Sequence, residues 1–206
     1  MNKIYALTDE NKVDNPVDIN MMPLPGFTPN ENDDSMKIEF ITPDGMVEDE
    51  EAAKKNGIYK MYKSADSKQV NPESVISISF SKKKSRVIDL NSFILRNAQN
   101  LKKLFPNQEL TVGLLHLPED VVKKFEDMAI PYQAVLFLAD EGINRPVYSC
   151  AIFFFETPDG FWSINWTAAR KILENEGRER GIFLGLIKFM IIGIQNPDTK
   201  TYEIHM

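Results

Sequence analysis

The segment at 147–166 constrains the fold more than any other part of the sequence, because two apolar runs there flank Thr-Pro-Asp-Gly at 157–160. Pro158 presets φ for the first central position of a turn, Asp159 can bond its own backbone, and Gly160 accepts a positive φ. A turn of this composition between two apolar runs predicts a β-hairpin with a bulged loop.

The two strands of this hairpin differ in pattern. The incoming strand is apolar on both faces, which is typical of a central strand covered on both sides. The outgoing strand alternates, with Trp162, Ile164 and Trp166 on one face, and is therefore predicted to be half buried. Aromatic residues on one strand face usually belong to a core. The alternative is an aromatic surface for a partner, and Tyr148, Trp162 and Trp166 are the candidate partner-binding residues.

Length and composition predict a soluble globular protein. The chain has 206 residues, of which 43% are hydrophobic and 26% are charged. Cys150 is the single cysteine, so an internal disulfide is excluded. The first residues lack the apolar run of a secretory signal, and the apolar segment at 182–194 is too short to span a bilayer. We therefore expect a cytoplasmic protein without a membrane partner.

The charge is unevenly distributed. Residues 1–56 carry thirteen Asp and Glu against five Lys, although the net charge of the whole chain is only −6. This distribution argues against a nucleic-acid partner and is compatible with a basic protein partner. Residues 9–35 are rich in Asn, Asp and Pro. We therefore predict an acidic, irregular N-terminal segment at 1–35 and a single α+β domain at 36–206.

The rest of the chain contains both strand and helix patterns. Strands are predicted at 36–42, 58–63, 75–80, 110–115, 132–139 and 200–205, and helices at 90–105 and 118–129. Thr167 is predicted to cap a further helix. The segment at 182–192 is assigned to a buried helix, although its isoleucines would also suit a central strand. These elements predict an α+β fold with a twisted, largely antiparallel sheet. The alternative is an α/β fold with a βαβαβ core at 75–139.

Catalytic constellations are scarce. A Cys150–His116 pair could form only if their strands were neighbours, and a cysteine among Ile and Phe is usually core. Asn30, Asn32 and Asp34 resemble the start of a calcium loop, but Ser35 replaces the required glycine. No catalytic residue, metal site or cofactor is therefore assigned. A hydrolase or transferase that uses His116 with a glutamate or Cys150 is the alternative function.

Residues 153–168 and 183–192 form a long apolar strand, a tight turn, an aromatic strand that ends in Trp-Thr-Ala, and an apolar helix. This order resembles the end of the PsbP/DcrB-like α+β domains. The resemblance implies a protein-binding role, because that family includes non-enzymatic binding proteins. We therefore expect a non-catalytic interaction module, such as a chaperone, an adaptor or an inhibitor or immunity-type protein. A third possibility is a subunit of an assembly that exposes Trp162 and Trp166 at an interface. The sequence leaves the oligomeric state open.

Overall fold

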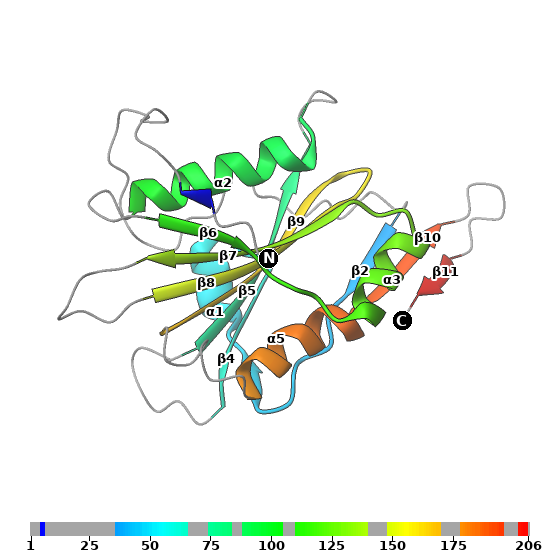
Figure 1. Ribbon diagram of the computed structural model, residues 1–206. Coiled ribbons are helices and arrows are strands. Elements are labelled where there is room, and N and C mark those ends of the chain that lie inside the picture. The colour runs from blue at the N-terminus through cyan, green and yellow to red at the C-terminus, as the bar shows by residue number, and fades with distance from the viewer. Residues whose placement is uncertain are drawn as a thin grey trace.

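The computed structural model describes residues 5–6, 36–65, 74–83, 88–104, 110–139, 148–169, 178–195 and 202–205. The large sheet is ordered β1-β6-β7-β8-β9-β5-β4-β3, and a small sheet is ordered β11-β10-β2 (Figure 1). All the described pairings are antiparallel, so the α+β prediction is confirmed. The strands are β1 (Tyr5–Ala6), β2 (Met36–Glu39), β3 (Met46–Glu48), β4 (Lys60–Ser64), β5 (Ser74–Lys82), β6 (Leu110–Leu114), β7 (Tyr132–Ala139), β8 (Tyr148–Glu156), β9 (Gly160–Ala169), β10 (Ile191–Gln195) and β11 (Tyr202–His205). The helices are α1 (Glu50–Asn56), α2 (Leu90–Leu104), α3 (Glu119–Asp127) and α5 (Arg178–Phe189).

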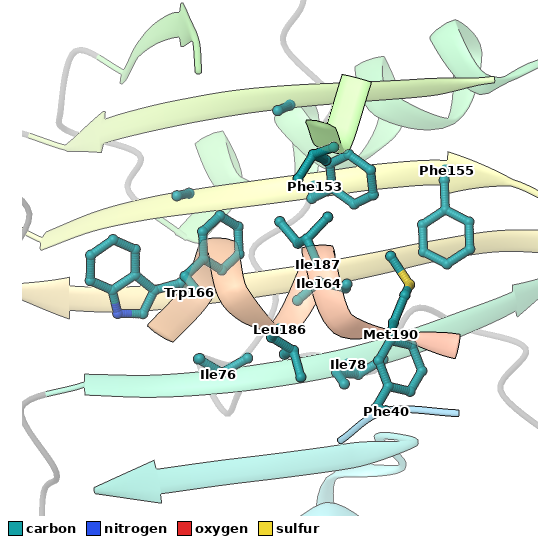
Figure 2. Close-up of a cluster of buried hydrophobic side chains, with 14 of the residues drawn as sticks. Phe40, Ile76, Ile78, Phe153, Phe155, Ile164, Trp166, Leu186, Ile187 and Met190 are labelled. Carbon is teal, nitrogen blue, oxygen red and sulfur yellow. The ribbon is translucent and has the colours of Figure 1, made fainter. Parts of the chain in front are cut away.

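Strand β8 is apolar on both faces and therefore has to be buried on both. The sheet is accordingly covered on each face. Ala151, Phe153 and Phe155 face α3, α5 and the small sheet, whereas Ile152 and Phe154 face α2. Figure 2 shows how Leu186 and Ile187 of α5, and Met190 directly after it, lie over the strands on the first of these faces. The larger core cluster is completed by buried side chains of β4, β5, β9 and β10, among them Tyr62, Ile76, Ile78, Ile164, Trp166 and Ile192.

The predicted hairpin is confirmed, but its loop is not bulged. Glu156 pairs with Phe161, and Thr157 and Gly160 exchange two backbone hydrogen bonds of 2.8 and 3.3 Å. The loop therefore contains only two residues, Pro158 and Asp159. The sequence suggested a positive φ at Gly160, but the φ of this residue is not positive. Glycine is required there because a Cβ would lie 2.3 Å from the Ser81 carbonyl oxygen.

A second Thr-Pro-Asp-Gly, at 42–45, has a different role. Here the Met46 N–H donates to the Pro43 carbonyl at 3.1 Å, and Gly45 has a φ of 75°. A positive φ at the third residue is typical of a type II turn. This turn does not close a hairpin. It leads from β2 in the small sheet to β3 at the edge of the large sheet.

The alternative βαβαβ core at 75–139 is wrong. In the sheet β5 lies between β9 and β4, and β6 pairs with β7 in antiparallel fashion. Alternating strand and helix patterns do not specify which strands pair. Here the two-sided β8 and its hairpin partner β9 lie between β7 and β5, which separates the strands that α2 connects.

The C-terminal region differs from two predictions. Thr167 lies within β9 rather than at a helix start, and the helix predicted after it falls largely outside the described residues. The segment at 182–192 contains both predicted alternatives, since α5 ends at Phe189 and β10 begins at Ile191. The Lys124 ammonium of α3 donates to the carbonyl of Lys188 at 2.9 Å and also to that of Met190. This contact satisfies backbone groups that the end of α5 leaves unpaired.

Several predicted elements are confirmed. The strands predicted at 75–80, 110–115 and 132–139 are β5, β6 and β7, and the helices predicted at 90–105 and 118–129 are α2 and α3. Shorter strands replace those predicted at 36–42, 58–63 and 200–205. Tyr5–Ala6 pairs with β6. The calcium-like residues at 30–34 and most of the segment at 1–35 lie outside the described residues, and the proposed domain boundary at residue 35 stays a prediction.

We expect Gly160→Ala to lower the free energy of unfolding by about 2–3 kcal/mol, the usual cost of forcing atoms into a packed region. The clash is with the Ser81 backbone and the Phe80 ring, which cannot both retreat from the added methyl group. Urea denaturation measures the change. Gly113→Ala is the matched control, because a Cβ at Gly113 would meet nothing within 4 Å. Equal stabilities for the two variants would contradict this explanation of Gly160.

Candidate binding surface

The described surface with the clearest binding character is residues 41–51, which we call the edge strip. The strip contains β3, the last described strand at one edge of the large sheet. Ile41 is 52% exposed and Val47 is 42% exposed, and residues 44–51 include five carboxylates and no basic residue. Apolar side chains bordered by charged ones are typical of protein–protein contacts.

The edge strip is positioned by local chemistry at both ends. The turn at Gly45 starts β3, and Asp49 caps α1 by accepting a hydrogen bond of 3.0 Å from the Ala52 N–H. The Lys63 ammonium lies 2.7 Å from the Asp49 carboxylate. This hydrogen bond is the main reason why the pKa of Asp49 is lowered. Helix α1 ends at Gly57, which adopts the left-handed conformation with a φ of 62°.

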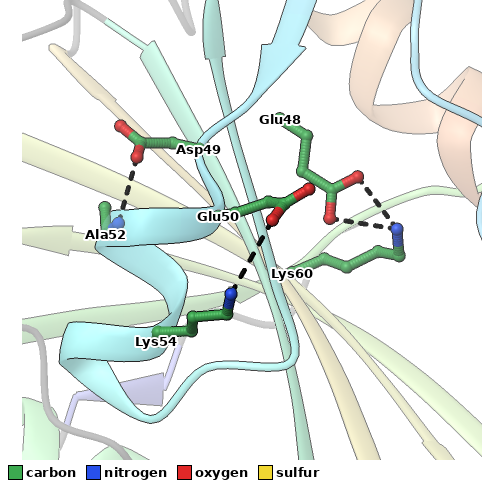
Figure 3. A network of polar contacts seen from close by, with 6 residues as sticks. All are labelled: Glu48, Asp49, Glu50, Ala52, Lys54 and Lys60. Atoms are coloured by element: carbon green, nitrogen blue, oxygen red, sulfur yellow. Dashed lines mark hydrogen bonds and ion pairs between the residues drawn. The ribbon is translucent and has the colours of Figure 1, made fainter.

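Three ion pairs hold carboxylates of the edge strip (Figure 3 shows those of Glu48 and Glu50). The Lys60 ammonium contacts both Glu48 oxygens, at 2.9 and 3.0 Å. Burial is the largest single effect and opposes the charge on Lys60, but the hydrogen bond to Glu48 and the electrostatic effects of Tyr62, Glu48 and Tyr59 together outweigh it, so the pKa of Lys60 is raised. Glu50 and Lys54 are 3.8 Å apart and exposed, so their pair contributes little. Within the described part of the chain, Asp44 and Glu51 have no ion pair.

Beneath the edge strip lies Tyr62, which pairs with Glu48 across β3 and β4 and is fully buried. Its hydroxyl makes no hydrogen bond to any described group. Burial raises the pKa of Tyr62, and the positive charge of Lys60 only partly offsets this effect. The hydroxyl is therefore a neutral polar group with an unmet hydrogen-bonding capacity.

The tryptophans proposed as partner-binding residues belong to the interior to different degrees. Trp166 is 1% exposed and stacks on Phe183 with ring centroids 5.7 Å apart, so its ring cannot reach a partner. Trp166 therefore cannot belong to the proposed assembly interface, which would have required both tryptophans to be exposed. Trp162 is half-buried, with ring centroids 4.8 Å from Phe80 and 5.2 Å from Tyr59. A partner-binding role for Trp162 stays a prediction, and the Tyr148 side chain lies outside what the structure describes.

The Cys150–His116 pair is not formed, because β7 lies between β6 and β8. His116 is exposed in the connection from β6 to α3, four residues beyond Val112, which is the residue of β6 that lies level with Cys150. The Thr167 hydroxyl is 3.7 Å from the Cys150 sulfur. Burial raises the pKa of the Cys150 thiol from 9.0 to about 11, so the thiolate required of a nucleophile is disfavoured.

The described residues contain neither a metal-binding cluster nor a membrane-spanning helix, and the sequence has no match among known families and curated proteins. No group of three or more His, Cys, Asp or Glu side chains in the described ranges could hold a metal ion. None of the described helices is both long enough and apolar enough to cross a membrane. The sequence matches no family model, and no curated protein matches it. The resemblance to the PsbP/DcrB-like domains therefore stays a prediction.

Sequence reasoning missed the edge strip as a surface. The acidic run at 48–51 leads directly into α1. The overlooked signal is the segment Met46-Val47-Glu48, which lies between a glycine turn and a helix cap. This strand is too short to show an alternation of apolar and polar residues.

We expect Tyr62→Phe to leave the free energy of unfolding unchanged or to raise it by up to about 1 kcal/mol. Removing a buried hydroxyl that has no partner relieves its desolvation cost. Thermal and urea unfolding would measure the difference, with Tyr62→Leu as a control that also removes the ring. A loss of more than about 1 kcal/mol in Tyr62→Phe would show that the hydroxyl is bonded in solution.

We also expect Cys150 to make stability depend on pH above 9. The pKa is higher in the folded state, so the stabilisation is complete below the unfolded pKa and is lost as pH rises toward 11. The loss approaches about 2 kcal/mol, because each pKa unit corresponds to about 1.4 kcal/mol. The measurement is urea denaturation from pH 8 to 11, compared with Cys150→Ala to remove contributions from other groups. Parallel curves for the two proteins would contradict the raised pKa.

Proposed function

We propose that this chain is a non-catalytic protein-binding module and that the edge strip contacts a basic partner. The observation that carries the proposal is the composition and place of the strip. It holds two of the six large hydrophobic side chains that are exposed among the described residues, and five carboxylates lie within the same segment of the chain. Such a surface combines apolar contact with charge selection.

The perturbed side chains support binding rather than catalysis. Cys150 and Tyr62 have raised pKa values and so remain protonated at neutral pH. Lys60 also has a raised pKa and is held by Glu48, which makes it a poor general base or nucleophile. Lys124 has a pKa lowered by burial, but it donates to two backbone carbonyls at the end of α5. Each of these groups has a structural explanation.

A chaperone, an adaptor or an inhibitor of another protein in the cytoplasm would each use such a surface. The acidic character of residues 1–56 supports a basic partner, because charges of the same sign lie in the strip and along the chain before it. The resemblance to the PsbP/DcrB-like domains supports the same class of function.

The proposal is tested with an edge variant, Ile41→Ser combined with Glu51→Lys, and with Leu95→Ser as a control. Leu95 lies on α2 and is 58% exposed, so its replacement removes a similar apolar area from another surface. Tagged proteins are used to capture partners from a lysate of the source cell, and captured proteins are quantified by mass spectrometry. Both variants must unfold at the wild-type temperature.

We expect at least one basic protein to be captured by the wild type and by Leu95→Ser, and to fall at least tenfold with the edge variant. Purified, that protein should bind the wild type at one defined stoichiometry. Equal capture by all three proteins, or no capture by any, would contradict the proposal.

A further inference from the structure

The edge of the large sheet offers three backbone groups that have no partner among the described residues. The Asp49 N–H donates to the Met61 carbonyl, and the Ala65 N–H donates to the Gly45 carbonyl. In the register of β3 and β4, these bonds assign the odd-numbered residues of β3 to hydrogen-bonded positions. The backbone groups of Met46 and Glu48 therefore point away from β4.

The turn before β3 reduces what the edge presents. The Met46 N–H is already bonded to the Pro43 carbonyl at 3.1 Å. The Met46 carbonyl and both the N–H and the carbonyl of Glu48 remain without a described partner. Outward donors and acceptors on alternate residues are what an added strand needs.

We propose that β3 binds an extended, basic segment of the partner as an added strand, bonded through the Met46 carbonyl and the backbone N–H and carbonyl of Glu48. This inference rests on the proposed function and specifies how the partner is held. Addition of a strand to an exposed sheet edge is a recurrent mode of peptide recognition, in which the backbone provides affinity and the side chains provide specificity.

The charges around β3 select the occupant. Asp44 precedes the strand and Glu51 follows it, both are exposed, and no described cation pairs with either. Lysine or arginine side chains at the two ends of an added strand would meet these carboxylates. Exposed edges in soluble proteins are commonly kept short and charged to prevent indiscriminate pairing. The same charges favour a basic strand over a neutral or acidic one.

Side chains on the two faces of β3 would contact the neighbouring side chains of the added strand. Val47 is exposed on the face opposite Tyr62 and Glu48, since successive side chains of a strand alternate. An apolar residue level with Val47 would cover it. The Tyr62 hydroxyl, buried and without a described partner, lies on the strand next to β3, close to Glu48 and Lys60. Both features lie at the same edge.

The backbone contact is tested by comparing Glu48→Pro with Glu48→Ala. Both substitutions remove the carboxylate and its contact with Lys60, but only proline also removes the outward N–H. Proline is tolerated on an edge strand where the N–H faces away from the sheet. The probe is an acetylated and amidated nine-residue peptide of alternating lysine and valine, and a glutamate–valine peptide is its control.

We expect the lysine–valine peptide to bind the wild type, the glutamate–valine peptide not to bind, and Glu48→Pro to bind about fivefold more weakly than Glu48→Ala. A factor of that size is the usual effect of one hydrogen bond. Calorimetry or fluorescence anisotropy at low ionic strength would provide the affinities. Equal binding by the two variants would overturn strand addition.

Amide hydrogen exchange in the wild-type protein tests the same idea without a substitution. Peptide binding should slow exchange of the Glu48 amide at least tenfold and leave the Val47 amide, which is already bonded to β4, unchanged. Unchanged exchange at Glu48 would overturn the inference.

The two proposals fail in different ways. If the edge variant Ile41→Ser with Glu51→Lys loses the captured partner while the Glu48 amide exchanges at the same rate with and without the peptide, strand addition is wrong and the binding function stands. If the captured partner is unaffected by the edge variant, the proposed surface itself is wrong.

Discussion

The burial of β8 on both faces is the constraint on which the rest of the structure depends. Every side chain of Ala151–Phe155 is buried, and each of the three phenylalanines contributes about 2 kcal/mol or more by leaving water. A strand of this kind cannot lie at an edge or face solvent. It requires a partner strand on each side and a covering layer on each face, and these are β7, β9, α2 and α5.

This central position determines which parts of the chain lie at the edges. Strands β7 and β9 enclose β8, β5 pairs with β9 along its whole length, and the sheet grows outward from there. The described edges are β1 and β3, which have two and three residues. The long strands are consequently used for the core, and the short ones are left to meet solvent or a partner.

The sequence predicts elements well where a period is long enough to be recognised. The alternation of Ile76, Ile78 and Phe80 and the two-sided run of β8 both led to correct strands. Pairing was less predictable, because the partner of a strand depends on contacts between segments distant in the chain. The two copies of Thr-Pro-Asp-Gly illustrate this limit. One closes a hairpin and the other joins two sheets, and only their surroundings distinguish Gly160 from Gly45.

The candidate site was harder to predict than the fold for a related reason. Tryptophans attract attention in a sequence, yet Trp166 lies opposite Ile76 on one side and Ala151 on the other, where a large ring fills the core. The edge strip consists of ordinary residues, and its binding character arises only because β3 has no outer neighbour among the described strands. The charges of the edge strip also oppose self-association of the chain. Two copies of this chain that paired through β3 would bring Asp44, Glu48 and Glu51 of each copy together, and like charges on adjacent strands destabilise a pair. An acidic edge therefore disfavours self-association and leaves the position open to a basic strand from another protein.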